Sequence, residues 1–254
     1  MTRAGRWARG LAGFAVVVAL SQLLAATGAI RPDFLPPAGT VLARAAGLTG
    51  DQDFLLGVAH TVRAWLTGLA CASGLGIGAG LLLGSVPALD DAVRPVLEFL
   101  RPIPSVALIP LAGLLLGAGL RSEVTLVTYA AVWPVLFATV YGLRHADPVP
   151  RETLRVFGFG RLAIVGRVAL PAAVPFIATG VRLAAAVGLI LAVGTEILAG
   201  FGTGLGVFIA QGQQVVDGTT DVLAGTVWAG TLGLIANALL ASGERRLLPW
   251  RAAA

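Results

Sequence analysis

The sequence predicts an all-α membrane protein with six transmembrane helices. The chain has 254 residues, of which 57% are hydrophobic and only 12% are charged, against about 25% charged residues in a soluble domain. Its mean hydropathy is +0.87, and its apolar residues form runs long enough to cross a hydrocarbon core of about 30 Å. The pI near 10.9 comes from arginines between these runs, which indicates membrane topology rather than nucleic-acid binding.

Several classes of chemistry are excluded by composition. All 18 basic residues are arginines, so the chain lacks the lysine of a G-x-x-x-x-G-K-[ST] phosphate loop and of Schiff-base catalysis. The single cysteine, Cys71, excludes a disulfide within the chain. No Ser–His–Asp set is recognisable, and no His/Cys/Asp/Glu cluster has metal-ligand spacing. We therefore expect a protein that is not an enzyme, with no catalytic residue, cofactor or metal.

The first predicted helix covers about residues 11–30 and follows Arg3, Arg6 and Arg9. A secretory signal peptide begins in the same way, so whether this helix is retained or cleaved stays open. Its length and the further runs downstream favour a transmembrane helix. Residues 31–53 are rich in Pro, Gly and Asp, which predicts a loop with a short helix near 41–46.

The second helix is predicted over about 55–86. Glycines four residues apart between 74 and 84 predict a face that another helix approaches closely. Asp90, Asp91 and Arg94 indicate a short polar loop. Prolines 102, 104 and 110 then predict a kinked or broken entry into the third helix, which ends near Gly119.

The fourth helix is predicted over about 124–143, interrupted by Pro134. The fifth has Pro171 and Pro175 in its first turns, where a missing N–H costs little, and runs to about Ala199. A glycine-rich break at 200–206 and a polar stretch follow, and the sixth helix covers about 222–241. Most arginines then lie on the side of the N-terminus, which predicts that both termini and residues 143–171 are cytoplasmic.

The stretch Val149–Pro171 is a polar, basic interruption of this apolar chain. Prolines at 148 and 150 end the preceding helix, and Gly158-Phe-Gly160 predicts a hinge between two short helical pieces. Val156 and Phe157 offer an apolar contact among arginines. Such a segment can lie on the membrane surface or bind in a partner's groove, and composition leaves both open.

The spacing of Glu152, Gly158, Val168 and Leu170-Pro171 resembles the EAA signature of ABC importer permeases, E-A-A-x3-G-x9-I-x-L-P. Thr153 and Leu154 replace the two alanines, and valine replaces isoleucine. Arg101-Pro-Ile-Pro-Ser105, Glu196-Ile-Leu198 and Gly204-Leu-Gly206 are similar to the branch that handles sulfonates, taurine and nitrate. The resemblance covers roughly residues 55–245.

This resemblance implies the fold of a type I ABC importer permease, N-in and C-in, in a bacterial inner (plasma) membrane. Residues 1–54 would be the first helix and an external loop, 55–245 the permease domain with a coupling-helix loop at 144–171, and 246–254 a cytoplasmic tail. Residues implied to couple to the ATPase are Glu152, Leu154, Val156, Phe157, Gly158, Leu170 and Pro171.

The resemblance also implies the partners. Two permease copies, expected to be a homodimer surrounded by membrane lipid, form the pathway. A separate ABC ATPase subunit supplies the energy, and an extracytoplasmic solute-binding protein delivers a small organic anion such as an aliphatic sulfonate, taurine or nitrate. No nucleic-acid partner is expected. The alternative hypothesis is a self-sufficient secondary transporter with six helices.

Arg182 and Glu196 are charges inside the predicted fifth helix, and such charges mark a pathway or a structural pair. Fourteen residues apart, they are separated by about 21 Å along a helix and do not pair with each other. Arg182 suits either attraction of an anionic substrate or an interhelical hydrogen bond. Glu196 would repel an anion, so a gate or a structural role suits it better. Both are predicted as possible pathway or gate residues.

Overall fold

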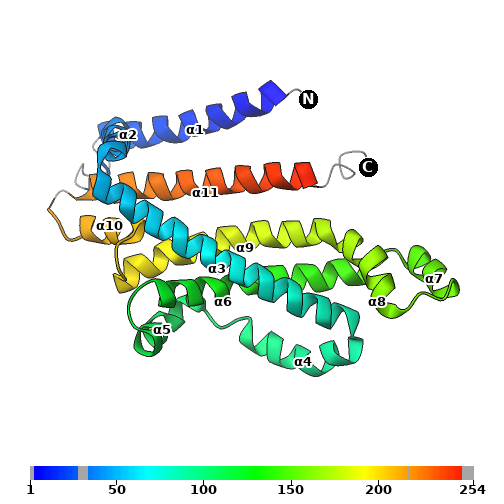
Figure 1. The fold of residues 1–254 in the computed structure, drawn as a ribbon. Helices are drawn as coiled ribbons and strands as arrows, with labels where there is room; N and C mark the ends of the chain where they lie inside the picture. The colour runs from blue at the N-terminus through cyan, green and yellow to red at the C-terminus, as the bar shows by residue number, and fades with distance from the viewer. Residues whose placement is uncertain (1–2, 28–33, 217, 248–254) are drawn as a thin grey trace.

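The structure, a computed structural model, describes residues 3–27, 34–216 and 218–247. Every regular element in these residues is helical, as predicted (Figure 1). The α-helices are α1 (Arg3–Ala26), α2 (Ala38–Gly47), α3 (Gln52–Ser85), α4 (Pro87–Leu100), α5 (Ile109–Leu116), α6 (Leu120–Arg144), α7 (Pro148–Val156), α8 (Arg161–Ile164), α9 (Leu170–Ala199), α10 (Leu205–Gly212) and α11 (Thr219–Leu247). Two 3-10 segments lie at Leu48–Gly50 and Ser105–Leu108, and a π-helical segment, Val165–Ala169, joins α8 to α9.

Four helices are long and apolar enough to cross a membrane: α3, α6, the continuous helix Arg161–Ala199, and α11. A fifth crossing is possible if α4 and the segment Ser105–Leu116, which are bent by 78° relative to each other, count as one broken span. The broken entry predicted for the third helix is therefore present. The first predicted span overlaps α1, in which Ala15–Ala25 is the apolar part, and its end at 28–30 lies outside the described residues. The count of six stays a prediction.

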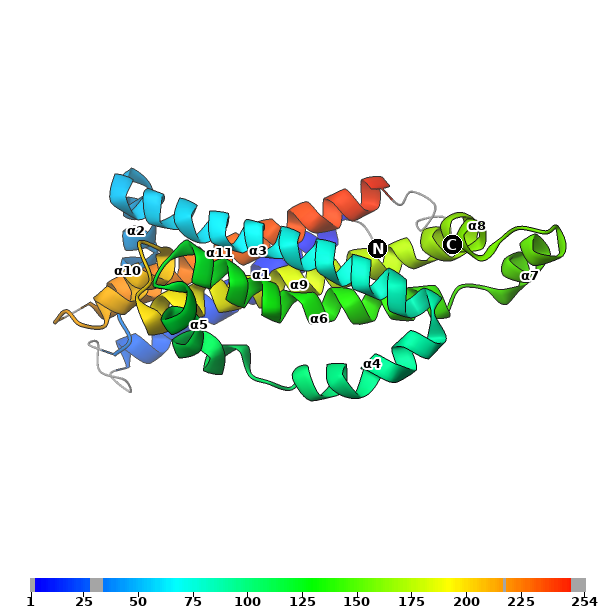
Figure 2. The same cartoon turned by 60° about the horizontal axis from the view of Figure 1, so that its bottom comes forward.

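The helices lie side by side along one long axis (Figures 1 and 2). In Figure 1, α3 and α6 run from left to right, α9 returns in the opposite direction beside α6, and α11 runs beside α9. In both views α4 lies on the outside of the bundle, below α6. This arrangement places α2, α5 and α10 at one end of the molecule and α7 and α8 at the other.

Glycines let α3 and α6 approach so closely that a side-chain carbon would overlap the facing helix. The four glycines of this kind recur on one face of α3, and each meets a residue of α6: Gly68 meets Val127, Gly76 meets Val135, Gly80 meets Thr139 and Gly84 meets Leu143. Ala72, which is fully buried, continues the row. Small residues at this spacing are a common basis of helix association in membranes. The close approach predicted from the glycine spacing is present, but Gly74 and Gly78 of the predicted set face open space.

The other side of α6 packs against α9, and glycines again allow the two helices to approach closely. A Cβ on Gly142 would lie 3.0 Å from the Cα of Ala173, and one on Gly180 would lie 2.6 Å from the Cβ of Ala138. Pro134 does not interrupt α6, which continues from Leu120 to Arg144. Neighbouring groups compensate for the lost hydrogen bond of a proline inside a membrane bundle, so the helix tolerates it.

The polar loop predicted at Asp90, Asp91 and Arg94 is wrong, because these residues lie in α4. Asp90 is buried near the start of this helix, and its Oδ2 accepts hydrogen bonds at 2.6 Å from both Arg94 and Arg144. An acid in the first turn of a helix is favoured by the macrodipole, and paired arginines compensate its burial. The charges therefore tie α4 to the end of α6 instead of marking a loop.

We expect Gly80→Ala to destabilise the bundle, because the new Cβ would lie 2.5 Å from the Cβ of Thr139. Overpacking of this kind costs about 1–3 kcal/mol. Gly78→Ala is the matched control, since its Cβ meets no described atom within 4 Å. That control is expected to be neutral or to stabilise by about 0.5–1 kcal/mol. The thermal unfolding midpoint of the purified protein in detergent measures both, and equal midpoints would contradict this packing.

Candidate functional site

Helix α7 projects beyond the bundle at the end where α6 finishes and α9 begins (Figures 1 and 2). Asp147 starts it, because its side chain accepts a hydrogen bond from Val149 N at 2.9 Å, and Pro148 occupies the first turn. The helix ends at Val156, and Gly158, two residues beyond, has a left-handed φ of +80°. There the N–H of Phe159 donates to Leu154 O and the N–H of Gly158 donates to Arg155 O, both at 3.0 Å. This pair of bonds is the Schellman motif, which terminates helices at a glycine.

Two arginines attach the α7 segment to the bundle. Arg151 donates to the carbonyl of Leu143 in the last turn of α6, which lacks a helical partner. The guanidinium of Arg167 lies 4.8 Å from the ring centroid of Phe159, within range of a cation–π interaction. The segment after Gly160 is continuous with α9, through the π-helical turn that precedes Pro171. Because Pro171 lacks an N–H and its ring would clash with a carbonyl of a regular turn, the wider π-turn accommodates it.

The tip of α7 carries large apolar side chains in the open. Val156 is 86% exposed and Phe157 is 75% exposed. Val149, in the first turn of α7, and Leu162, in α8, are exposed as well. Glu152 is exposed as well. Apolar groups gathered on a polar, projecting element indicate a surface that another molecule covers.

At the opposite end, the end of α9 holds a carboxylate against the start of α10. Glu196 is 0% exposed, and its Oε2 accepts a hydrogen bond from Gly206 N at 2.7 Å. The hydroxyl of Thr61, on α3, donates to Glu196 Oε1 at 2.8 Å and accepts from Leu205 N at 2.9 Å. A helix start needs such acceptors for its free N–H groups and favours negative charge. Helix α10, absent from the predicted elements, therefore forms where α3 and α9 supply both acceptors.

Two glycines make this approach possible. A Cβ on Gly204 would overlap the Glu196 carboxylate, and one on Gly206 would overlap the carbonyl oxygen of Val193. The predicted break at 200–206 is present, with Gly200 in the left-handed conformation at the end of α9. What sequence reasoning missed is that Glu196 and Gly204-Leu-Gly206 form one unit.

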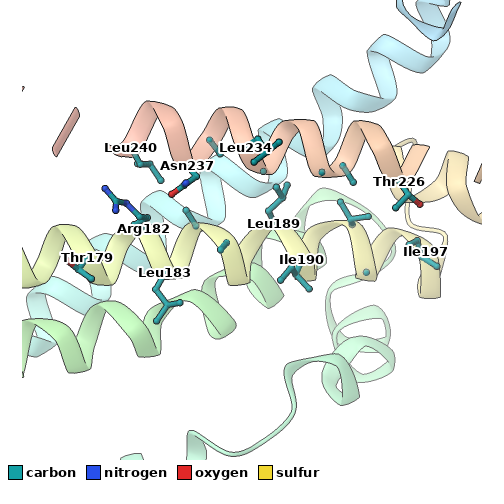
Figure 3. Close-up of a pocket in the computed structure, with 18 residues that line it drawn as sticks. Thr179, Arg182, Leu183, Leu189, Ile190, Ile197, Thr226, Leu234, Asn237 and Leu240 are labelled. Carbon is teal, nitrogen blue, oxygen red and sulfur yellow. The ribbon is translucent and has the colours of Figure 1, made fainter. Parts of the chain in front are cut away.

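A groove of about 910 Å³ lies between α9 and α11 (Figure 3). Its walls are mostly apolar, and its few polar lining residues are Thr179, Arg182, Thr226 and Asn237. Arg182 donates to Glu244 of α11, which is an interhelical ion pair. Glu196 faces α3 and α10 instead. The structure therefore keeps Arg182 and Glu196 apart, and their roles as pathway or gate residues stay predictions.

Residues 72–249 match the family described as the binding-protein-dependent transport system inner membrane component. The chain is a member of this permease family. It is 29% identical to the putative aliphatic sulfonates transport permease of Bacillus subtilis, over 96% of this chain and 88% of that one. It is 30% identical to the taurine transport system permease of Escherichia coli, over 93% and 87% of the two chains. It is 29% identical to a nitrate import permease of Synechocystis, over 72% and 66%. The permease therefore falls in the predicted sulfonate, taurine and nitrate branch.

A solved structure shows the same fold. The permease superposes on a chain of the inward-facing MetNI methionine ABC transporter with a TM-score of 0.65, covering 76% of this chain and 95% of that one. Their sequences are 20% identical. The fold predicted from the resemblance, an ABC importer permease built from helices in a membrane, is supported at this level.

Within the permease, the structure divides the residues expected to couple to an ATPase into three groups. Glu152, Val156 and Phe157 are exposed on α7. Leu154 and Gly158 form the bonds that end the helix. Leu170 and Pro171 lie farther along the chain, at the start of α9. The residues of this one sequence signature thus form the exposed surface of α7, the C-terminal cap of α7 and the start of α9.

Replacing Gly158 by alanine should loosen α7, because an L-residue at φ +80° costs about 1–2 kcal/mol. Hydrogen exchange of the amides of residues 151–159 is expected to accelerate about fivefold or more, since 1.4 kcal/mol corresponds to tenfold. Gly160→Ala is the control, because Gly160 has an extended conformation and an added Cβ meets no described atom within 4 Å. Equal exchange in the two variants would show that α7 does not depend on this cap.

Replacing Thr61 by valine should destabilise the opposite end, since the start of α10 loses an acceptor and Glu196 loses a donor. Leaving such buried groups unsatisfied costs about 1–3 kcal/mol each. Thr67→Val, on the same helix, is the control, because Thr67 is exposed and its hydroxyl donates to the Arg63 carbonyl within its own helix. Thermal unfolding in detergent compares the two variants, and an unfolding midpoint for Thr61→Val as high as that of Thr67→Val would contradict this role.

Proposed function

We propose that this permease is the transmembrane subunit of an ATP-driven ABC importer and that α7 binds a separate ATPase subunit. The observation that carries the proposal is the capped, projecting α7 with Val156 and Phe157 exposed at its tip. An amphipathic helix of this kind suits a groove on a partner protein. Glu152, exposed on the same helix, supplies a polar contact beside the apolar ones.

The attachments of α7 suggest how motion reaches the bundle. Arg151 connects α7 to the end of α6, and Phe159 lies against Arg167 on the helix that continues into α9. A displacement of α7 by the ATPase would therefore move α6 and α9, the two helices that pack closely through Gly142 and Gly180. Leu170 and Pro171 lie on this path, at the start of α9.

We also propose how the permease is oriented in the membrane and which partners it has. Helix α7 and the end of α11 would be cytoplasmic, with the N-terminus on that side. The opposite end, with α2, α5 and α10, would receive substrate from a solute-binding protein. A second permease copy, in a homodimer, would complete the pathway, and lipid would cover the remaining exposed apolar side chains.

The proposed substrate is a small organic anion of the aliphatic sulfonate, taurine or nitrate kind. The support is that the similar permeases of Bacillus subtilis, Escherichia coli and Synechocystis are named for the transport of aliphatic sulfonates, taurine and nitrate. Arg182 lines the groove beside α11, but its charge is paired with Glu244. We therefore assign selection of the anion mainly to the solute-binding protein, and propose that Arg182 and Glu196 shape the pathway or its gate.

Val156→Asp tests the α7 surface, because a carboxylate placed in an apolar interface loses its hydration without a partner. Co-purification with the cognate ATPase is expected to weaken at least tenfold, with the unfolding midpoint of the permease unchanged. Val216→Asp is the matched control, since Val216 is 89% exposed against 86% for Val156 and lies at the opposite end of the molecule. If Val156→Asp retains as much ATPase as Val216→Asp, α7 is not the docking helix.

A further inference from the structure

Three potential metal ligands converge where α3, α6 and α9 meet. They are His60 on α3, Glu123 at the start of α6 and Glu196 near the end of α9. The Nδ1 of His60 lies 3.7 Å from Glu123 Oε2 and 3.9 Å from Glu196 Oε1. One donor atom from each residue lies within 4.8 Å of the other two. The sequence predicted no metal site, because these three residues are far apart in the chain and do not form a local motif with metal-ligand spacing.

No hydrogen bond from the described residues explains the burial of the Glu123 carboxylate. Its side chain is 0% exposed, and neither oxygen has a hydrogen bond within the described part of the chain. The Nδ1 of His60 is also buried and has no hydrogen bond to any of these described residues. His60 supplies the only basic nitrogen of the described residues within 4.0 Å of either carboxylate. Buried carboxylates need a compensating positive charge, and the two acids share one histidine as their basic neighbour among the described residues.

The distances are too long for hydrogen bonds and lie near the spacing of ligands around one transition metal ion. Zinc binds His nitrogen and carboxylate oxygen at about 2.0–2.2 Å in a tetrahedral arrangement, so two of its ligand atoms lie about 3.4 Å apart. The separations of 3.7 and 3.9 Å exceed a hydrogen bond. They are within about 0.5 Å of the tetrahedral spacing, and all three donor atoms lie within 4.8 Å of one another, so small side-chain rotations would bring them onto one ion. Glu196 is further oriented by Thr61 and Gly206 N, which is how outer partners hold a ligating carboxylate. The His60 side chain is 23% exposed, which leaves an entry path.

We propose that His60, Glu123 and Glu196 bind one divalent transition metal ion of the Zn²⁺ class. The ion connects α3, α6 and α9 and fixes the carboxylate that holds the start of α10. One nitrogen and two carboxylate oxygens leave at least one coordination position for water. The metal site does not involve α7 or the substrate. A negative result for metal binding would therefore leave the proposed transport function unaffected, and the reverse also holds.

The test uses the tag-free full chain purified in detergent and stripped with a chelator. Zn²⁺ binding is measured by competition with a chromogenic chelator, and bound metal per chain by elemental analysis. The test variant is Glu123→Gln, because Glu123 makes no hydrogen bond that the amide would break. Glu98→Gln is its control, since Glu98 is exposed on α4. His60→Asn is paired with His145→Asn, which changes the only other histidine of the chain.

We expect one Zn²⁺ per wild-type chain and at least tenfold weaker binding in Glu123→Gln and His60→Asn, with both controls unchanged. Thermal unfolding gives a second readout. Without metal, Glu123→Gln should be at least as stable as the wild type, and with saturating Zn²⁺ only the wild type and the controls should gain stability. Absence of saturable binding, or equal binding in wild type and Glu123→Gln, overturns the site. A carboxylate pair that holds a proton instead of a metal would give the first of these results.

Discussion

The close approach of α6 to its two neighbours is the constraint on which the rest of the structure depends. Lipid tails are as apolar as leucine, so membrane helices gain little from hydrophobic burial against each other and rely on close packing. Gly76, Gly80 and Gly84 of α3 and Gly180 of α9 remove side chains where α6 passes. Helix α6 is thereby held between two long helices, and both of its ends are positioned by that packing.

Buried charged residues lie at both ends of α6, and they differ in whether their charges are paired. At one end, Arg144 pairs with Asp90 and the last carbonyls receive Arg151, so the charges are satisfied and anchor α4 and α7. At the other end, Glu123 is buried beside His60 and accepts no hydrogen bond from any residue that the structure describes. A satisfied charge in a bundle is explained by its partner, whereas an unsatisfied one implies a missing ligand or proton. We therefore interpret Asp90 and Arg144 as structural charges and Glu123 as part of a candidate binding site.

Sequence reasoning succeeded where the physical signal was local. Gly158 ends α7 because only a left-handed residue completes its cap, and Asp147 and Pro148 start it, so the chain stretch itself specifies this helix. The loop predicted at Asp90 from local polarity was wrong. Asp90 is buried in α4 because Arg94 and Arg144 donate hydrogen bonds to its carboxylate. Sequence reasoning also missed α10, whose start depends on acceptors supplied by Thr61 and Glu196 from two other helices.

By itself, the sequence determined that this is a helical membrane protein, which stretch projects from it, and which family signature that stretch carries. These features follow from hydropathy, helix caps and residue spacing, all of which act over a few turns of one helix. The tertiary structure alone decided that Glu244 neutralises Arg182, that Glu196 holds α10, and that His60 and Glu123 lie beside it. Such relations depend on the register between helices, and register is set by packing of glycine against side chains distant in the chain.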